Sequence, residues 1–376
     1  MSSTLSRARR LIAVLLLLVL APAAQPKFTA PMSASLDAAS QSREGRAAKG
    51  TPEQMIVAAI DAIRAGRMRD ARATVDALLV REPDYRLAHL LSADLYAMHN
   101  GPLRTVGGAA SGPADLLEGL RHEAMARVQA SRNPPPADAL PANLLILAPK
   151  QHHAVVVETD TSRVYLFSND QGVPRRIADF YTTIGKLGVD KYKEGDQRTP
   201  LGVYFVTSEM PRAQLDAMLG KKADLYGIGA WPISYPNELD IQQGRTGHGI
   251  WLHGVPYDTY ARSPWSSNGC VALGNEDMHL LSSSLQVGIT PVVIVRKINW
   301  LPRDAWQQQR QAALAMVDRG QAGALPEDLS VLAGDIAAEQ RVATFDDAQA
   351  GGVRRQYWQR TGNDWQVVWD GPAKSG

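Results

Sequence analysis

The chain has 376 residues, a formal net charge of +2 and 45% hydrophobic residues. This length and apolar content are enough to bury a core and predict two or three domains. The charge is close to neutral and forms no clustered basic patch, which argues against a nucleic-acid partner. Cys270 is the single cysteine, so an internal disulfide is excluded.

The first 23 residues have the organisation of a secretory signal peptide. Arg7, Arg9 and Arg10 precede an apolar run at 11–20, and small residues continue to Ala23. A charged start, a short apolar middle and small residues near the cleavage point define such signals. We therefore expect cleavage near Ala23 and a periplasmic protein of a bacterial envelope, with an uncleaved anchor as the alternative. No cysteine follows the apolar run, which excludes a lipoprotein anchor.

A linker and a helical region are expected next. Residues 24–50 are rich in Ala, Ser, Gly and Pro and predict disorder. Thr51 before Pro52 predicts a helix start, and apolar residues then recur at helical spacing, with breaks at Gly66 and Pro83. This pattern within residues 51–130 resembles a tetratricopeptide (TPR-like) hairpin, which implies a site for a protein partner. A plain helical hairpin packed on the next domain is the alternative, because one repeat is short for a solenoid.

The rest of the chain predicts an α+β protein whose central part is mostly β. Prolines at 131–142 predict a linker, and short β-rich runs between Gly and Pro predict a β domain over 143–299. Residues 300–376 predict a helix followed by a hairpin that turns at 361–364. Its aromatic residues are expected to form one apolar layer: Tyr357, Trp358, Trp365 and Trp369.

The stretch SPWSSNGCVALGNED at 263–277 surrounds the only cysteine. A lone cysteine is either a small buried apolar residue or a reactive thiolate. The Ser-Ser-Asn-Gly residues before Cys270 are turn formers, and a turn that exposes the sulfur favours the reactive alternative. A nucleophilic cysteine also needs a base close to it.

His248 and His253 lie in the strand that leads towards Cys270. Residues at this spacing face opposite sides of a regular strand, which argues against two ligands of one metal ion. The sequence has no His, Cys and carboxylate cluster with ligand spacing, so we expect no metal and no other cofactor. His253 is the better base, because Gly254 ends the strand and offers a carbonyl that can fix the tautomer of the ring.

The segments GDQRTPLGVYFV (195–206), IWLHG (250–254) and SSNGCVAL (266–273) occur in this order. Together they resemble the L,D-transpeptidase catalytic domain, or YkuD family, of bacterial cell-wall enzymes, over residues 151–297. The resemblance implies a β-sandwich-like catalytic domain. The sequence is also similar to the branch of the family that includes cell-shape L,D-carboxypeptidases. In that branch an NTF2-like domain follows the catalytic domain. Residues 300–376 resemble the last strands of such a domain and are too few for a complete one.

The resemblance implies roles for individual residues. Cys270 matches the nucleophile and His253 the base, with Gly254 orienting the ring. Ser267 and Gly269 support the turn, and the N–H groups of Gly269 and Cys270 are expected to hold the oxyanion. The substrate-binding residues are expected to be Asn268, Trp265, Tyr204 and His248.

Two positions depart from the family's pattern. The family often has His where this chain has Asn268, and Arg or Asn where it has Ala272. Neither position supplies the nucleophile or the base, so the chemistry is expected to remain while the contacts to the substrate differ. Asp196 and Arg198 are interpreted as structural residues of a turn.

The sequence therefore predicts an exported cysteine acyltransferase on peptidoglycan stem peptides. An L,D-transpeptidase passes the acyl group to an amine, and the alternative, an L,D-carboxypeptidase, passes it to water and trims tetrapeptides to tripeptides. A wall-binding scaffold without catalysis is a remote alternative. A secreted cysteine protease has only the Cys–His pair in its favour.

Overall fold

The computed structural model describes residues 49–98, 101, 105–108, 110–320, 324–347 and 351–374. The predicted signal peptide at 1–23 lies outside the described residues, as does the predicted linker at 24–50 apart from its last two positions. Within the described ranges, no helix is both long enough and apolar enough to cross a membrane.

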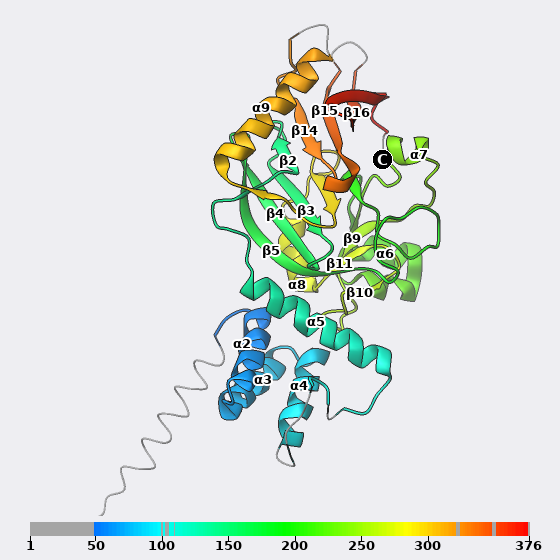
Figure 1. The fold of residues 1–376 in the computed structure, drawn as a ribbon. Coiled ribbons are helices and arrows are strands. Elements are labelled where there is room, and N and C mark those ends of the chain that lie inside the picture. The colour runs from blue at the N-terminus through cyan, green and yellow to red at the C-terminus, as the bar shows by residue number, and fades with distance from the viewer. Residues whose placement is uncertain are drawn as a thin grey trace, which may run out of the picture. The chain divides into compact units, whose positions relative to one another are not determined.

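The N-terminal region is helical and has its own apolar core. Its helices are α2 (Pro52–Arg64), α3 (Met68–Arg81), α4 (Arg86–Ala97) and α5 (Ala114–Arg132). The side chain of Thr51 caps α2 in a capping box with Gln54, and Gly66 adopts a φ of +71° where α2 gives way to α3. Ile56 and Leu91 are buried in the core that these helices share. The expected helical pair is therefore extended by α4 and by the long helix α5 (Figure 1).

The catalytic region is built on a sheet that the described residues form from ten strands. Its strands are β3 (His153–Glu158), β4 (Arg163–Asp170), β5 (Val173–Gly185), β6 (Gly202–Phe205), β7 (Met210–Pro211), β8 (Gly229–Pro232), β9 (Trp251–His253), β10 (Trp265–Ser267), β11 (Val271–Leu273) and β12 (Pro291–Val295). They lie in the order β6-β12-β3-β4-β5-β11-β9-β8-β7, and β10 pairs with β5. The short helices α6 (Arg212–Leu219), η2 (Gly220–Tyr226), α7 (Glu238–Gln242) and α8 (Asn275–Ser282) connect them.

The sheet is continuous but curled, so that its two halves enclose one core. Val155 and Val164 from one half and Leu252 and Val271 from the other belong to the same buried cluster. The strand β5 joins the halves, because it pairs with β4 along most of its length and with β11 at its end. The expected β-sandwich-like arrangement is thus made by one sheet facing itself.

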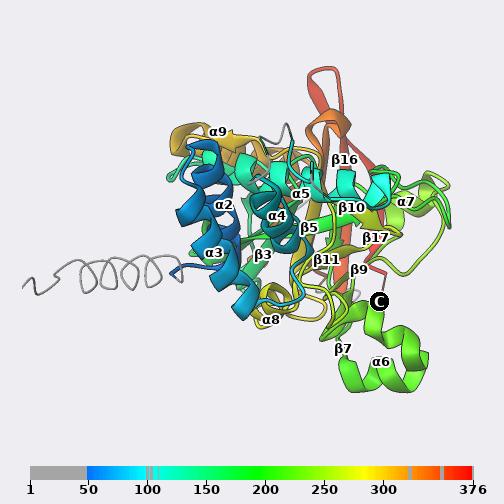
Figure 2. The same cartoon turned by 90° about the horizontal axis from the view of Figure 1, so that it is seen from below.

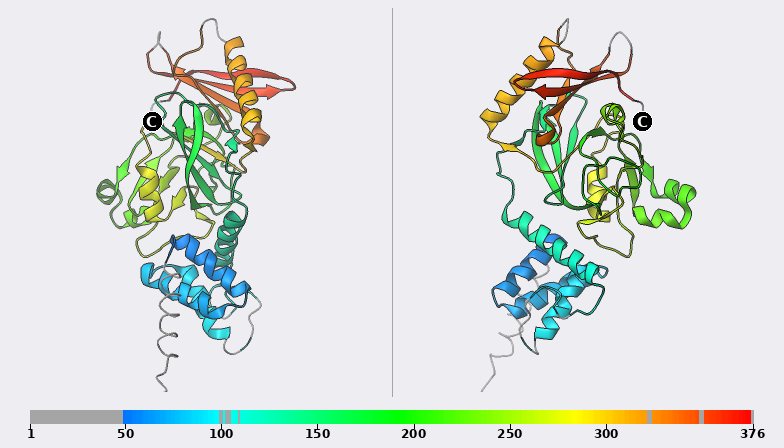
Figure 3. Two further views of the ribbon diagram at one scale, coloured as in Figure 1. Left: turned by 90° about the vertical axis from the view of Figure 1, so that its left-hand side faces the viewer. Right: turned by 45° about the vertical axis from the view of Figure 1, so that its right-hand side comes forward.

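The C-terminal region adds a second sheet and a helix. Its elements are β13 (Trp300–Leu301), α9 (Arg303–Arg319), β14 (Ser330–Ala333), η3 (Ile336–Ala338), β15 (Gln340–Asp346), β16 (Val353–Thr361) and β17 (Asp364–Pro372). The sheet has the order β17-β16-β15-β14-β2, and its last strand, β2 (Leu144–Ile146), comes from a point in the sequence before the catalytic sheet. One face of this sheet packs on the outer side of β3 and β4, and α9 covers the other face (Figure 3).

Two sequence expectations change with this arrangement. The four aromatic residues of the hairpin do not form one layer: Tyr357 and Trp369 face the catalytic sheet, whereas Trp358 and Trp365 face α9. Successive residues of a strand point to opposite faces, and both faces of this sheet are covered. The segment 131–142 also differs from a plain linker, because α5 continues to Arg132 and β1 (Leu140–Pro141) pairs with β13.

The helical region is attached to the catalytic sheet by a buried cluster of charges. Arg127 of α5 donates from Nε to Glu123 at 2.9 Å, and its guanidinium lies 3.9 Å from the ring centroid of Tyr181 on β5. Glu53 of α2 is 3.6 Å from Arg127 and 2.6 Å from Arg163 of β4. A buried pair of this kind is costly to break. The helical region therefore packs on the catalytic sheet through these contacts, and the α+β fold class is confirmed.

Candidate active site

The turn that carries Cys270 is held by its own side chains. Buried Ser267 donates from Oγ to the carbonyl of Cys270 at 2.6 Å and accepts from the N–H of Gly269 at 3.0 Å. Gly269 has a φ of +126°, and a Cβ there would lie 2.7 Å from the carbonyl oxygen of Arg198. Only glycine fits a position with both constraints. The Ser-Asn-Gly-Cys sequence therefore fixes the approach to Cys270.

The GDQRTPLG segment supports this turn from the other side. Thr199 is fully buried, and its Oγ1 donates to the carbonyl of Gly269 at 2.9 Å. The same oxygen accepts the N–H of Gly185 at 2.9 Å, so it joins the end of β5 to the cysteine turn. A buried hydroxyl that bonds on both sides is expensive to replace with an apolar group.

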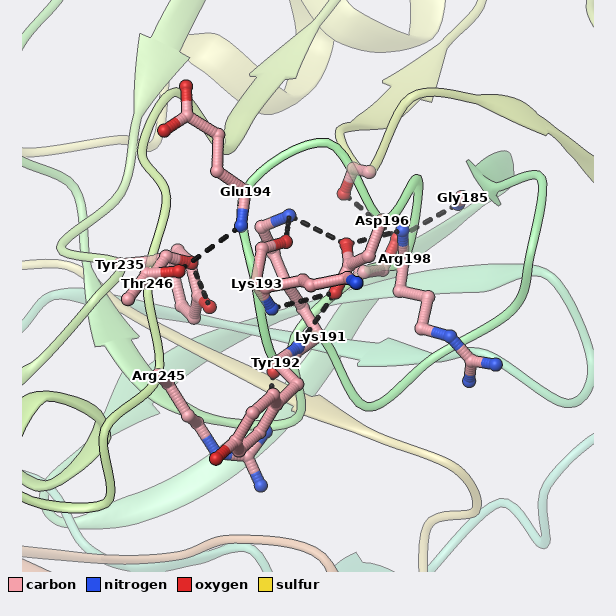
Figure 4. A network of polar contacts seen from close by, with 12 residues as sticks. Gly185, Lys191, Tyr192, Lys193, Glu194, Asp196, Arg198, Tyr235, Arg245 and Thr246 are labelled. Carbon is pink, nitrogen blue, oxygen red and sulfur yellow. Dashed lines mark hydrogen bonds and ion pairs between the residues drawn. The ribbon is translucent and has the colours of Figure 1, made fainter.

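Asp196 organises the loop that precedes Thr199, as Figure 4 shows. Its carboxylate accepts from the backbone N–H groups of Tyr192, Lys193 and Arg198, and it lies 2.7 Å from Nζ of Lys191. Burial by itself raises the pKa of Asp196, but these hydrogen bonds more than offset it and lower the pKa to about 2. The carboxylate is therefore ionised at neutral pH, and the loop is ordered around it. This is the structural role expected for Asp196.

His253 is buried at the end of β9, with 3% of its surface exposed. Its Nδ1 lies 2.5 Å from the carbonyl oxygen of Gly254. Since a carbonyl only accepts, Nδ1 carries the proton and Nε2 has a free lone pair. Burial lowers the pKa of His253 to about 4, although the bond to Gly254 opposes the shift. The neutral imidazole is thus poised to accept a proton at neutral pH.

His253 ends β9, and Cys270 directly precedes β11, the parallel strand paired with β9. Ala272 of β11 is paired with His253 of β9, and Val271 with Leu252. Tyr226, whose ring packs on His253, also acts electrostatically on Cys270. The strand pairing therefore brings the predicted nucleophile and base to one end of these two strands.

The Cys270 thiol is protonated in the resting structure. Burial raises its pKa to about 11, while backbone hydrogen bonding from Trp251 and the positive charges of Arg262 and Lys191 lower it. Its Sγ lies 3.4 Å from the carbonyl oxygen of Gly249. A neutral thiol beside a neutral imidazole favours deprotonation during attack over a preformed thiolate–imidazolium pair.

Asn275, the first residue of α8, fixes the end of β9. Its Oδ1 accepts from the N–H groups of Ile228 at 3.3 Å and Val255 at 3.2 Å, and its Nδ2 donates to the Val255 carbonyl at 2.8 Å. A Cβ on Gly254 would lie 2.2 Å from this Oδ1. Gly254 therefore leaves room for Asn275, which in turn holds the chain next to the carbonyl that orients His253.

The four residues predicted to bind the substrate differ in their exposure to solvent. Asn268 is exposed beside Cys270, and Trp265 is 47% exposed on β10. His248 is also exposed, and its Nδ1 lies 3.9 Å from Glu194. Tyr204 is a correction: it is 0% exposed, and its hydroxyl donates to the carbonyl of Leu201 at 3.1 Å. The covered faces of β6 leave this ring no surface for a substrate.

The predicted oxyanion donors also need a correction. The N–H of Gly269 is already bonded to Ser267, so it does not point to a free acceptor site. Of the two donors expected from the sequence, this leaves the N–H of Cys270. The positive charge of Arg262, which acts on Cys270, is a second source of stabilisation for a developing negative charge.

Sequence reasoning missed several residues around the pair. The ring of Tyr226 packs edge-on against His253 with centroids 5.0 Å apart, and Arg262 and Lys191 both act electrostatically on Cys270. Asn275 completes the set; it lies in the stretch 263–277 around Cys270, but its residue type did not indicate its contacts. Tyr226, Arg262 and Lys191 lie outside the short motifs, and the one hint for Arg262 is that it lies in the loop from His253 to Cys270.

The helical region touches this same loop. The ring of Tyr85 packs on Tyr260 with centroids 4.2 Å apart, and the hydroxyl of Tyr181 donates to the carbonyl of Arg262 at 2.9 Å. A Cβ on Gly119 of α5 would lie 2.4 Å from Oγ of Ser263. Seen from below, α5 runs past α2 and α4 beside the strands (Figure 2). The loop that joins His253 to Cys270 is therefore packed against the helices.

No group of three or more His, Cys, Asp or Glu side chains suited to a metal ion occurs among the described residues. The arrangement consists of a neutral base, a thiol at the same end of the paired strands, and nearby positive charge. It can carry out acyl transfer through a cysteine.

Fold and site together define an L,D-transpeptidase-like domain. Residues 152–294 match the family model of the L,D-transpeptidase catalytic domain, YkuD, and this part of the chain is a domain of that family. Members of the family act on peptidoglycan, so the match supports a peptidoglycan-modifying role. No curated protein sequence matches the chain.

Some solved structures are similar to the chain at low sequence identity. Bd1075 from Bdellovibrio bacteriovorus is 20% identical with a TM-score of 0.51, over 63% of this chain and 98% of that one. The helical cell shape determining protein Pgp2 from Campylobacter jejuni is 18% identical with a TM-score of 0.45, over 61% and 95%. An L,D-transpeptidase (Yku) from Stackebrandtia nassauensis is 15% identical with a TM-score of 0.29, over 55% and 77%.

Proposed function

We propose that the protein is an exported cysteine acyltransferase that acts on the stem peptides of peptidoglycan, as an L,D-transpeptidase. The observation that carries the proposal is the pairing of β9, which ends at His253, with β11, which directly follows Cys270, together with the 2.5 Å distance from Nδ1 of the histidine to the carbonyl oxygen of Gly254. The family match at 152–294 supports the substrate class. The pattern of residues 1–23 supports export to the periplasm.

The reaction proceeds in two transfers. The sulfur of Cys270 bonds to the carbonyl carbon of the third stem residue, a diamino acid such as meso-diaminopimelate, while the thiol proton passes to Nε2 of His253. The bond to the terminal D-alanine breaks, and its amine takes that proton. An acceptor then opens the thioester and gives its proton to His253, which restores the thiol. An amine acceptor gives a cross-link, and water gives a tripeptide.

The helices contribute to the proposed enzyme by holding the loop that joins base and nucleophile. A protein partner at their outer surface is a further part of the proposal, supported by the resemblance of the first two helices to a tetratricopeptide pair. Because the same helices anchor to β4 and β5 through Arg127 and Arg163, such a partner would bind next to the catalytic domain.

The test is incubation of the mature protein with disaccharide-tetrapeptides, followed by mass spectrometry. Dimers joined between two diamino acids support transpeptidation, and tripeptides alone support the carboxypeptidase alternative. Cys270→Ala should form neither product, whereas Ser266→Ala, a change in the same turn, should retain turnover. Absence of both products with the native protein would contradict the enzymatic proposal and favour a non-catalytic scaffold.

A further inference from the structure

A cavity of about 570 Å³ lies beside the catalytic domain, between α2, α5, the β3–β4 turn and β10. Cys270 and His253 do not line it. Its volume falls within the range of ligand sites, which is roughly 300–1,000 Å³. The cavity is therefore large enough for a ligand portion separate from the peptide that reaches the cysteine.

One face of α5 forms a wall of this cavity. His122, Met125, Gln129 and Arg132 line it at spacings of three and four residues, which is one side of a helix. The buried residues Glu123 and Arg127 lie on another side and attach the helix to the catalytic sheet. The wall is thus fixed relative to β10 by contacts that the cavity does not use.

The cavity combines positive charge with an exposed aromatic ring. Arg64, Arg121 and Arg132 line it together with Asp160, and Arg132 is paired with Asp61 at 2.5 Å. Trp265 is 47% exposed there and packs edge-on against His122, with ring centroids 5.1 Å apart. Arginine side chains recognise carboxylates in a planar, bidentate way, and an exposed indole offers an apolar face.

A second cavity of about 360 Å³ shares two lining residues with the first. Asp160 and Trp265 line both cavities, and Arg198 and Arg296 line the second. The chain from Trp265 to Cys270 spans at most about 18 Å when extended, so Trp265 lies within that distance of the nucleophile. We call the two together the Trp265 groove, defined by Trp265, Asp160, Arg64, Arg121, Arg198 and Arg296.

We propose that the Trp265 groove binds a glycan chain of peptidoglycan that is longer than one disaccharide, while one of its stem peptides, or that of a neighbouring chain, reaches Cys270. The apolar faces of sugar rings pack on Trp265, and the carboxylates of further stem peptides pair with the arginines. This inference rests on the proposed function, because it takes its ligand from that substrate class. Two linked contacts raise the affinity for a chain above that for a single unit.

The experiment measures binding and not turnover. Cys270→Ala protein is titrated calorimetrically with a single disaccharide-tetrapeptide and with glycan chains of several such units. We expect the chains to bind more tightly, and Trp265→Leu and Arg64→Gln, each added to Cys270→Ala, to weaken chain binding about tenfold. Arg64→Gln should leave single-unit binding within twofold. Arg69→Gln is the matched control, because Arg69 is exposed on α3 and lines neither cavity.

The outcomes separate this inference from the proposed reaction. Two results would overturn the proposal that the Trp265 groove binds a glycan chain. One is chain binding that is unchanged in both groove variants, and the other is equal affinity for chains and single units. Selective loss of chain binding in the groove variants supports it. Chain binding through the groove by a protein that turns over no muropeptide also supports the groove, and it counts against the proposed reaction.

Discussion

The Nδ1 atom of His253 lies 2.5 Å from the carbonyl oxygen of the next residue, Gly254. This bond fixes the tautomer, and burial lowers the pKa of the ring to about 4. The histidine should therefore remain a competent base well below neutral pH. We expect the acid limb of the kcat/KM profile to fall near pH 4, and a limb near the ordinary histidine value of about 6.5 would contradict this.

The lowered pKa of His253 also makes the free energy of unfolding depend on pH. An unfolded histidine has a pKa near 6.5, so between about pH 6.5 and 4 the unfolded chain binds the extra proton. The contribution of His253 to the free energy of unfolding is about 3 kcal/mol. It is fully present above pH 6.5 and is lost as the pH falls through 4. His253→Gln should lack this component. The measurement is the difference between the urea-unfolding free energies of the two proteins from pH 4 to 7.5.

The Cys270 thiol should react as a protonated group. With a pKa of about 11, its alkylation by iodoacetamide should rise about tenfold per pH unit from pH 7 to 10 without levelling. At pH 8 it should react on the order of a hundredfold more slowly than a free thiol. Glutathione is the control, since its rate levels earlier. A plateau between pH 5 and 8 would indicate a thiolate–imidazolium pair instead.

Thr199 is expected to position Cys270 and not to touch the substrate. Thr199→Val removes the bonds to Gly185 and Gly269, and we expect kcat to fall about tenfold with KM changed less than twofold. Thr199→Ser keeps the hydroxyl and should restore most of kcat. A rise in KM alone would show that Thr199 contributes to binding.

The buried pair of Arg127 and Glu123 lies within α5 and holds the guanidinium that stacks on Tyr181 of β5. Arg127→Met leaves the Glu123 carboxylate buried without its partner and should lower the free energy of unfolding by about 3 kcal/mol. Adding Glu123→Gln should recover much of the loss. Chemical denaturation of both variants measures this, and Arg69→Met on the exposed side of α3 is the control. An additive loss in the double variant would contradict the pairing.

The sequence predicted what short motifs determine. Cys270, His253 and Gly254 lie in local turns and strand ends, where residue type dictates backbone geometry, and their placement agrees with the structure. The α+β class follows in the same way from helical spacing before residue 131 and short β-rich runs after it. Tyr226 and Arg262 reach the site through tertiary packing, which spacing along the chain does not encode.

Misplaced residues share one physical cause. The strands β6 and β16 are covered on both faces, so the usual alternation between apolar and polar residues is absent from them. Tyr204 therefore looked available to a substrate, and Tyr357 and Trp358 looked like one layer. The membership of β2 in the C-terminal sheet could not be predicted either, because its three apolar residues would fit that sheet or the catalytic sheet equally well.

The pairing of β2 with β14 constrains how the protein is made. Asn143, just before β2, donates to the carbonyl of Ala333, 190 residues further along the chain. During synthesis the segment at 144–146 must wait, with its apolar residues uncovered, until almost the whole polypeptide has left the ribosome. The catalytic sheet is in effect an insertion between the first and second strands of the C-terminal sheet. Protein shortened at the C-terminus would expose Leu144 and Leu145, so the tail cannot be removed as an independent appendage.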